Sequence, residues 1–112
     1  MIGKTVEVVV DRPIGSYHPK FKDSVYKVNY GFIPHTLGRD EKELGCYILG
    51  VDKPIEKFEG VVIAIIERLD DIENKLVVSK EGMKFSALEI KKYVYPQEKY
   101  FKTRIITNEG DL

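Results

Sequence analysis

The chain has 112 residues, enough for one hydrophobic core but too few for two, so we expect a single domain over residues 1–112. Eighteen basic residues balance eighteen acidic ones, and a net charge of zero argues against broad attraction to nucleic acid or to an anionic membrane. The N-terminus carries no signal-peptide pattern and no apolar run is long enough to span a bilayer, which predicts a cytoplasmic protein without membrane contact.

Five short segments with many β-branched residues predict β-strands. In chain order they are residues 4–10, 24–30, 46–51, 60–66 and 74–79. Pro13 is expected to stop the first strand, because proline cannot donate a hydrogen bond to a neighbouring strand. The third and fourth segments are almost continuously apolar, as strands buried on both faces are. Cys46, the only cysteine, is therefore predicted to be a buried and unreactive thiol.

The segment after the fifth strand has the pattern of a helix. Ser86 and Glu89 form a capping box, in which the serine accepts a hydrogen bond from the first turn and the glutamate reaches back. Pro96 is expected to kink this helix or to restart it before residues 97–102, because proline removes a donor and clashes with the preceding turn. Five strands and one helix predict a mainly β fold, namely an OB-like five-stranded barrel with a C-terminal helix.

Two acidic turns are candidates for a metal site. Their acidic residues are Asp40, Glu41 and Glu43 in the first turn and Asp70, Asp71 and Glu73 in the second. Carboxylates three residues apart on a turn can converge on one hard cation, and ligand sets made only of oxygen suit Mg²⁺. Each turn also has the composition of an ordinary solvated connection, and this alternative stays open. Turns that join neighbouring barrel strands can face the same end of the barrel, which would bring the two together.

A basic and aromatic segment is the candidate for an anion site. Its members are Tyr17, His18, Lys20, Lys22, Tyr26, Lys27 and Tyr30. Lysines beside tyrosine hydroxyls supply charge and directed hydrogen bonds to an anionic ligand, although a solvated loop over core aromatics has the same composition. Neither His18 nor His35 has the spacing of a zinc site. Tyr100, Lys102 and Arg104 form a second basic group, for which the dipole at a helix end is a sufficient reason.

Acidic turns near basic strands on a small barrel fit a metal-assisted reaction on a phosphate group. Bound Mg²⁺ polarises phosphoryl oxygens, and lysines neutralise the charge that develops on the leaving group. The sequence contains no G-x-S-x-G motif, Walker A motif or dinucleotide fingerprint, which argues against the enzyme classes built on those motifs.

Four stretches of the chain resemble the soluble family I inorganic pyrophosphatases. They are GSYHPK at residues 15–20, NYGFIPHTL at 29–37, VVIAIIERLDDIENKLVV at 61–78 and QEKYFK at 97–102. The resemblance runs in order from about residue 14 to residue 102 and is greatest to the short bacterial branch of the family. It implies an inorganic pyrophosphatase-like protein that hydrolyses pyrophosphate, or a related phosphoanhydride, to phosphate with Mg²⁺ as cofactor.

The resemblance also implies roles for individual residues. Those that fall on or near pyrophosphate-binding positions are Lys20, Tyr30, Lys75, Tyr100 and Lys102. The implied metal ligands are Asp40, Glu43, Asp70 and Glu73, with Asp71 as the alternative to Asp70, and the implied catalytic residues are Asp40, Glu43 and Lys75. Lys42 and Gly45 take two acidic positions of the family's first loop, where Glu43 is the nearby carboxylate able to substitute. We therefore expect one Mg²⁺, and we expect the double change Lys42→Asp with Gly45→Asp to raise hydrolysis.

The departures in this loop keep a second class of function open. In that alternative the chain is a non-catalytic OB module with an eroded metal site, which binds phosphate, a nucleotide or another protein. Interleaved lysines and tyrosines also fit single-stranded nucleic acid, but the zero net charge opposes that reading. The expected partner is pyrophosphate or a related phosphate ligand, and a homo-oligomer is among the states that the sequence allows.

Overall fold

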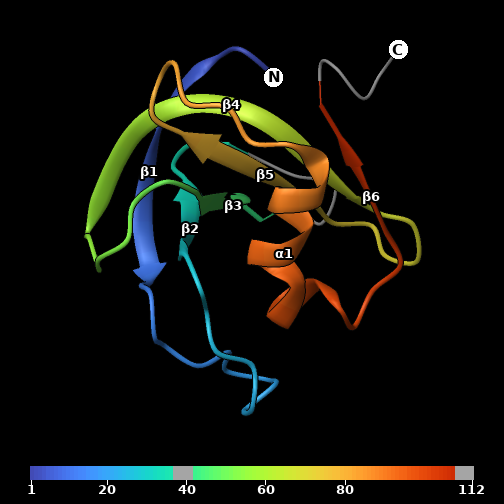
Figure 1. The fold of residues 1–112 in the computed structure, drawn as a ribbon. Coiled ribbons are helices and arrows are strands. Elements are labelled where there is room, and N and C mark those ends of the chain that lie inside the picture. The colour runs from blue at the N-terminus through green and yellow to red at the C-terminus, as the bar shows by residue number, and fades with distance from the viewer. Residues whose placement is uncertain (37–41, 108–112) are drawn as a thin grey trace.

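A computed structural model describes residues 1–36 and 42–107 (Figure 1). Its elements, in chain order, are β1 (Thr5–Arg12), β2 (Asn29–Ile33), β3 (Leu44–Ile48), β4 (Lys57–Arg68), β5 (Asn74–Ser79), α1 (Ala87–Glu98) and β6 (Thr103–Ile106). Asp40 and Glu41 of the first acidic turn lie outside the described residues. No helix in the described part of the chain is long and apolar enough to cross a membrane.

Five of these strands close into a barrel. Neighbours follow the order β1, β2, β3, β5 and β4, and the pairing of β1 with β4 completes the ring. β3 and β5 run parallel, whereas the other barrel pairs are antiparallel. β6, which the sequence pattern did not predict, extends the sheet beyond β4. The predicted OB-like five-stranded barrel with a C-terminal helix is confirmed.

The long strand β4 connects most of the barrel. It pairs with β1 near its start, with β5 along its second half and with β6 over its last residues, and in Figure 1 it arches across the barrel. From Gly60 onward, buried residues alternate with half-exposed ones as the pleat requires. The alternation continues to the last residue, Arg68, so the strand carries a cation into a buried position.

Alternate residues of β3 and β5 pack into two hydrophobic cores. One core contains Tyr47 and Val77 and is covered by Ile90 and Val94 of α1. The other contains Cys46, Ile48, Leu76 and Val78, together with residues of β1 and β4. Cys46 is fully buried, and burial raises the pKa of its thiol to about 12. The prediction of a buried, unreactive cysteine is therefore confirmed, because the reactive thiolate is disfavoured.

The predicted start of the second strand was wrong. This strand begins at Asn29, and residues 24–26 instead pair with residues 15–18 through backbone hydrogen bonds and one bridge. Of the two expectations for Pro96, a kink or a restart of the helix, the restart is wrong, because one helix includes Pro96 and ends at Glu98. Contacts from outside the helix hold this last turn, because Gln97 donates to the Ser24 hydroxyl and Glu98 accepts from a buried arginine. The capping box of Ser86 and Glu89 is confirmed.

Gly31 fixes the close approach of β2 to β1. A Cβ atom at this position would lie 1.9 Å from the backbone oxygen of Val9, so no other residue fits without moving the strand. The register between β1 and β2 shifts between Val10 and Arg12, and such a bulge re-aims the side chains beside it. Beyond the shift Arg12 pairs with Tyr30, which brings its guanidinium beside the aromatic residues described next.

Candidate active site

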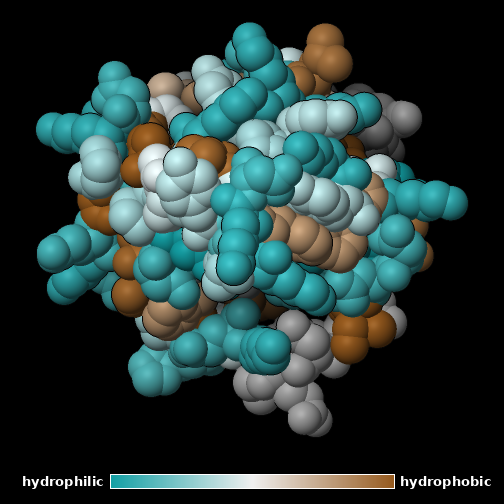
Figure 2. All heavy atoms as spheres, turned by 90° about the horizontal axis from the view of Figure 1, so that it is seen from below, coloured by the Kyte–Doolittle hydropathy of each residue, from teal (hydrophilic) through white to brown (hydrophobic). Residues whose placement is uncertain are grey.

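A cavity of about 620 Å³ opens among β1, β2, β5, the segment 18–21 and the end of α1. Its charged lining residues are Asp11, Arg12, Lys20, Lys42, Glu43, Arg68, Asp71, Glu73 and Lys75. The loop before β2 and the end of α1 lie low in Figure 1, and Figure 2 shows the molecule from that side, covered mostly by hydrophilic residues with small apolar patches between them. The lining therefore brings cations and carboxylates together in one cavity.

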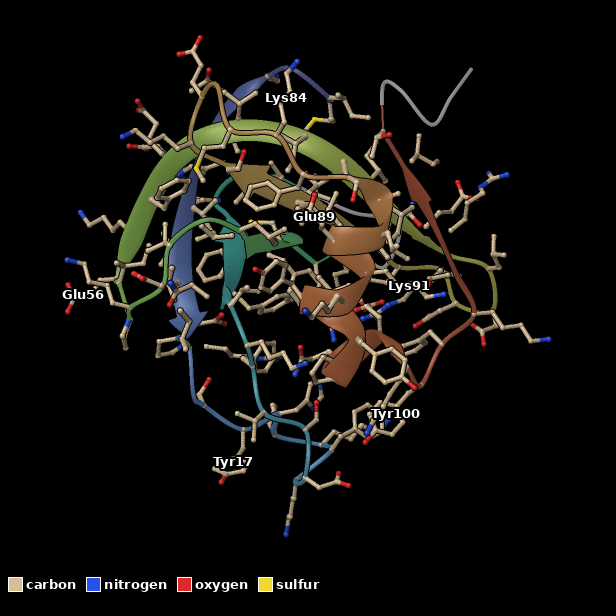
Figure 3. The ribbon with its side chains drawn as sticks, viewed as in Figure 1. Tyr17, Glu56, Lys84, Glu89, Lys91 and Tyr100 are labelled. Atoms are coloured by element: carbon tan, nitrogen blue, oxygen red, sulfur yellow. The ribbon has the colours of Figure 1, made fainter. Side chains whose placement is uncertain are left out.

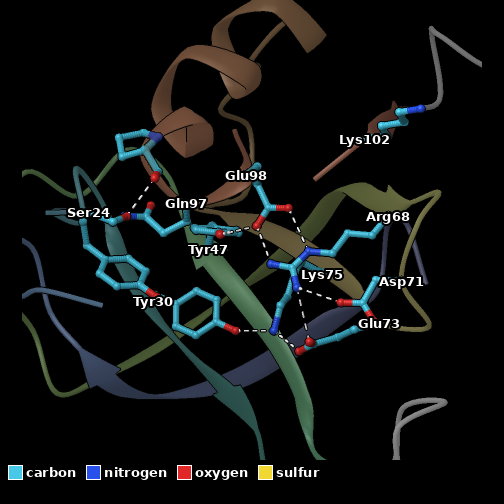
Figure 4. A network of polar contacts seen from close by, with 12 residues as sticks. Ser24, Tyr30, Tyr47, Arg68, Asp71, Glu73, Lys75, Gln97, Glu98 and Lys102 are labelled. Atoms are coloured by element: carbon cyan, nitrogen blue, oxygen red, sulfur yellow. Dashed lines mark hydrogen bonds and ion pairs between the residues drawn. The ribbon is translucent and has the colours of Figure 1, made fainter. Parts of the chain in front are cut away.

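One side of the cavity is a network of paired charges, which we call the paired wall (Arg68, Asp71, Glu73, Lys75 and Glu98; Figure 4). Arg68 donates from Nε and Nη2 to the two carboxylate oxygens of Glu98, at 2.9 and 2.7 Å. Its Nη1 donates to Glu73 at 3.2 Å and lies 3.8 Å from Asp71. The guanidinium also stacks on the ring of Phe101, 3.8 Å from its centroid. One planar cation is thus surrounded by three carboxylates.

The charges of the paired wall are strongly coupled. Burial by itself would lower the pKa of Arg68, but the hydrogen bonds and charge of Glu98 overcome it and raise that pKa above its ordinary value. Glu98 also accepts a 2.5 Å hydrogen bond from the hydroxyl of Tyr47. Burial, followed by the charge of Glu98, raises the pKa of Tyr47 well above its usual range. Arg68 is therefore permanently charged and Tyr47 permanently protonated at neutral pH.

Lys75 joins this network to Tyr30. Its ammonium donates to Glu73 and, at 2.5 Å, to the Tyr30 hydroxyl. Burial raises the pKa of Tyr30, so the hydroxyl keeps its proton while it accepts from Lys75. Gly45 leaves the space for this pair: a Cβ atom there would lie 2.2 Å from the Tyr30 hydroxyl and 2.8 Å from Lys75 Nζ. An acidic side chain at position 45 therefore requires Tyr30 or Lys75 to move.

A second part of the cavity lining is what we call the open wall, and it consists of Arg12, His18 and Lys20. Arg12 donates to the Tyr26 hydroxyl at 2.7 Å and lies 5.2 Å from the ring centroid of Tyr30. Lys20 is exposed, with its ammonium 6.0 Å from the ring centroid of Phe21. These cations contact rings and a hydroxyl, and Asp11 acts on Arg12 electrostatically. Their charge is consequently less neutralised than that of the paired wall.

His18 has a defined tautomer on the open wall. Its Nδ1 accepts hydrogen bonds from the backbone N–H groups of Lys20 and Phe21, at 2.9 and 3.1 Å. A ring nitrogen that accepts has no proton, so Nε2 carries the hydrogen of the neutral imidazole. Burial lowers the pKa of His18, and the nearby cations lower it further. His18 is therefore a neutral donor at the cavity surface.

Most of the predicted substrate and metal residues that the structure describes line the cavity, but not all of them do. Lys20, Tyr30, Glu43, Glu73 and Lys75 line the cavity, whereas Asp70, Tyr100 and Lys102 are not among its lining residues. Asp70 accepts from the backbone N–H of Lys102, and Asp71 takes its place at the cavity. The Tyr100 hydroxyl donates to Asp23 while its ring stacks on Phe21. Asp40 lies outside the described residues.

Sequence reasoning missed several lining residues. They are Arg12, Tyr47, Arg68, Gln97 and Phe101. Gln97 and Phe101 lie in the stretch 97–102 that resembles the family, but neither was predicted to belong to the site. Arg68 carried one signal that was overlooked, namely a cation that keeps the buried phase of an alternating strand. The buried Gln97 donates to Ser24 and to the Val25 carbonyl, while its Oε1 has no hydrogen-bond partner among the residues that the structure describes.

The described carboxylates do not fit a divalent cation held by the protein. Within residues 1–36 and 42–107, no three histidine, cysteine, aspartate or glutamate side chains are close enough to hold a metal ion together. Glu73 and Asp71 surround Arg68, and Glu43 accepts from the backbone N–H of His35 at 3.0 Å. Carboxylates already neutralised by a guanidinium are poor ligands for a second cation.

Comparison with known proteins shows the family to which the chain belongs. Residues 4–102 match the family model described as inorganic pyrophosphatase. No curated protein sequence matches the chain significantly. Solved structures match at low sequence identity, and this likeness shows a shared fold and nothing further.

Three of these structures are bacterial inorganic pyrophosphatases. The one from Helicobacter pylori is 18% identical with a TM-score of 0.68, covering 95% of this chain and 86% of its own. The one from Ehrlichia chaffeensis is 13% identical with a TM-score of 0.72, covering 96% and 88%. The one from Coxiella burnetii is 16% identical with a TM-score of 0.69, covering 99% and 90%. The match over residues 4–102 and this shared barrel show that the chain belongs to the inorganic pyrophosphatase family.

Proposed function

We propose that this protein binds pyrophosphate in the cavity and hydrolyses it to two orthophosphate ions. The observation that carries the proposal is that Arg12 and Lys20 line the same cavity as the Lys75–Tyr30 pair in a domain of the pyrophosphatase family. A small, highly charged anion is stabilised where several cations converge.

The described residues divide the work of binding. Arg12 and Lys20 supply charge from the open wall, and Lys75 supplies it from the paired wall. The Tyr30 hydroxyl accepts from Lys75 and keeps a proton to donate to a phosphate oxygen. His18 offers its Nε2–H in the same way. Tyr100 and Lys102 stay predicted substrate residues, which would have to turn from their present positions to reach the anion.

Hydrolysis needs little covalent chemistry from the protein. The oxygen of a water molecule bonds to one phosphorus, the bridging P–O bond breaks, and the protons of the water leave on the orthophosphate products. Lys75 and the open wall neutralise the charge that grows on the departing phosphate. Glu43 lines the cavity and, with Asp40, is the proposed acceptor that orients the water.

The family generally uses a divalent metal, and we propose Mg²⁺ here. It would enter with the phosphate oxygens of pyrophosphate, because Mg²⁺ retains several waters and needs few protein ligands. Asp40 and Glu43 are the proposed protein contacts. Asp70 and Glu73 would join them only by leaving the Lys102 backbone and Arg68. Cytoplasmic location, a homo-oligomer and a single domain over residues 1–112 also stay proposals.

Release of orthophosphate from pyrophosphate tests this function. The purified protein should release phosphate in Mg²⁺, and Lys75→Ala should reduce the rate by at least about tenfold, because a charge-assisted contact to phosphate is lost. Lys84→Ala is the matched control, since Lys84 lies at the opposite end of the molecule from Tyr17 and Tyr100 (Figure 3). Equal rates for these two variants would place the activity elsewhere.

A melting experiment separates catalysis from binding alone. Pyrophosphate at millimolar concentration should raise the melting temperature, because a ligand that prefers the native state stabilises it. Orthophosphate should raise it less. A clear shift without phosphate release would favour the non-catalytic module, and no shift by either ion would remove the phosphate site altogether.

A further inference from the structure

The paired wall holds a cation where three carboxylates converge. Asp71 and Glu73 come from the turn between β4 and β5, and Glu98 comes from the end of α1. Arg68 reaches all three from the last position of β4 while only 9% of its surface is exposed. Carboxylate oxygens are the ligands that a hard divalent cation prefers, but here a guanidinium stands between them, and within residues 1–36 and 42–107 no three such side chains are close enough to hold a metal ion together.

The geometry favours a permanent rather than an exchangeable cation. Both nitrogens on one edge of the guanidinium donate to both oxygens of Glu98, and such bidentate pairs have a fixed orientation. Phe101 covers the guanidinium face, and the Tyr47 hydroxyl satisfies Glu98 from another direction. The guanidinium is therefore held in place by contacts on its edge and on its face.

We infer that Arg68 is a resident substitute for a divalent cation: it holds the carboxylates of the paired wall together and neutralises part of their negative charge, so that pyrophosphate binds as an anion without a metal ion on that wall. This inference rests on pyrophosphate being the ligand, as proposed above. Mg²⁺ then serves hydrolysis and is not required for binding.

Removing the guanidinium should convert the site to metal dependence. Arg68→Met keeps an unbranched stem beside Phe101 but leaves three carboxylates facing the vacated space, with Lys75 as the remaining partner of Glu73. Pyrophosphate should then be repelled until a divalent cation restores the charge. Calorimetry with methylenediphosphonate, a pyrophosphate analogue whose bridge cannot be hydrolysed, measures the affinity. We expect the wild-type affinity to differ by less than about threefold between chelator and Mg²⁺, whereas the variant loses at least about tenfold in chelator and regains most of it in Mg²⁺.

Arg104→Met is the matched control. Arg104 makes a single pair with Glu67 on the exposed surface, at 2.6 Å, so the same substitution there creates no cluster of carboxylates. Its pyrophosphate affinity should match wild type with and without Mg²⁺. If Arg68→Met does not fold in chelator, the double variant Arg68→Met with Glu98→Gln removes the most buried carboxylate and allows the same comparison.

A second readout does not depend on pyrophosphate. Bound Mn²⁺ loses its free-ion electron paramagnetic resonance signal, so titration of the protein reports metal binding directly. Arg68→Met should bind Mn²⁺ at least about tenfold more tightly than wild type and Arg104→Met. If wild type fails to bind pyrophosphate, the proposed function falls and the part of the inference that concerns pyrophosphate falls with it, but tighter Mn²⁺ binding by Arg68→Met still supports Arg68 as the substitute for a metal ion. An equal loss of pyrophosphate affinity in chelator and Mg²⁺, or wild-type binding that requires Mg²⁺, would overturn the inference while the function stands.

Discussion

The two walls of the cavity use their cations in different ways. On the paired wall, Arg68 and Lys75 are buried and contact carboxylates from two other elements. On the open wall, Arg12 and Lys20 contact a hydroxyl and aromatic rings. Charges that neutralise one another in a buried network hold the structure together, whereas charges that meet only polarisable groups retain their field for a ligand. The difference predicts that substitutions on the open wall change affinity with little change in stability, whereas those on the paired wall change stability as well.

The largest effect should come from Glu98→Gln, which keeps the shape of the paired wall but removes its most buried charge. Arg68 and the Tyr47 hydroxyl would both lose a carboxylate acceptor. We expect the free energy of unfolding to fall by about 3 kcal/mol, because the change removes the charge of the bidentate partner of a buried cation. Urea denaturation measures it. Glu67→Gln removes a carboxylate from the exposed Arg104 pair and should cost less than about 1 kcal/mol; similar costs at both positions would erase the distinction between buried and exposed pairs.

A smaller effect is expected next to the paired wall, where Gly45 lies against the Tyr30 hydroxyl and the Lys75 ammonium. Gly45→Ala brings a methyl group against the Tyr30 hydroxyl, and overpacking of this kind costs about 1–3 kcal/mol. The penalty should shrink in a Tyr30→Phe background, because the hydroxyl that lies 2.2 Å from the new atom is gone. A double-mutant cycle of unfolding free energies tests this coupling; additive penalties would contradict it. For the same reason Gly45→Asp cannot simply add a ligand, so the gain of hydrolysis expected for Lys42→Asp with Gly45→Asp now rests on Lys42→Asp.

On the open wall the affected quantity should be affinity. Lys20→Ala removes an exposed ammonium and should change the free energy of unfolding by less than about 0.5 kcal/mol. Pyrophosphate affinity should fall about tenfold, because a charge-assisted contact to phosphate contributes roughly 1.5 kcal/mol or more. Calorimetry on Lys20→Ala and Lys84→Ala gives the comparison. Loss of stability without loss of affinity would assign Lys20 to the paired class.

The smallest effect concerns pH at His18. Burial lowers the pKa of this imidazole from its ordinary value of 6.5. The positive charges of Arg12, Arg68, Lys75 and Lys20 lower it further. The unfolded chain therefore binds more protons, and the stability contributed by neutral His18 falls as pH drops from its unfolded pKa toward its lowered folded pKa. His18→Asn retains an acceptor for the two backbone N–H groups and should flatten this part of the pH dependence.

Bound pyrophosphate would place negative charge beside His18 and favour its protonated form. Binding near pH 6 should then take up protons, which calorimetry detects as a heat that depends on the ionisation enthalpy of the buffer. Proton uptake that persists in His18→Asn would assign it to another group.

Local pattern and the family resemblance predicted the barrel because the strand segments are β-rich and the capping box begins α1 at Ala87. They failed where distant contacts decide the outcome. Residues 24–28 alternate like a strand, but residues 24–26 pair with residues 15–18. Pro96 stays helical because Ser24 and Arg68 hold the turn around it.

The site was predictable only in part for the same reason. Lys20, Tyr30 and Lys75 lie in segments that resemble the family, and they do line the cavity. Arg68 and Glu98 are 30 residues apart in sequence, and their pairing depends on the end of β4 meeting the end of α1. No local pattern encodes that meeting, so the paired wall became visible only in three dimensions.

Phosphorus-31 magnetic resonance tests the central claim most directly, because it reports binding and turnover of pyrophosphate in one sample. With wild-type protein and Mg²⁺, the pyrophosphate signal should broaden and then decline as the orthophosphate signal grows, and both changes should weaken in Lys20→Ala but not in Lys84→Ala. A pyrophosphate signal that stays sharp and constant beside folded wild-type protein would contradict the assignment of this cavity to pyrophosphate.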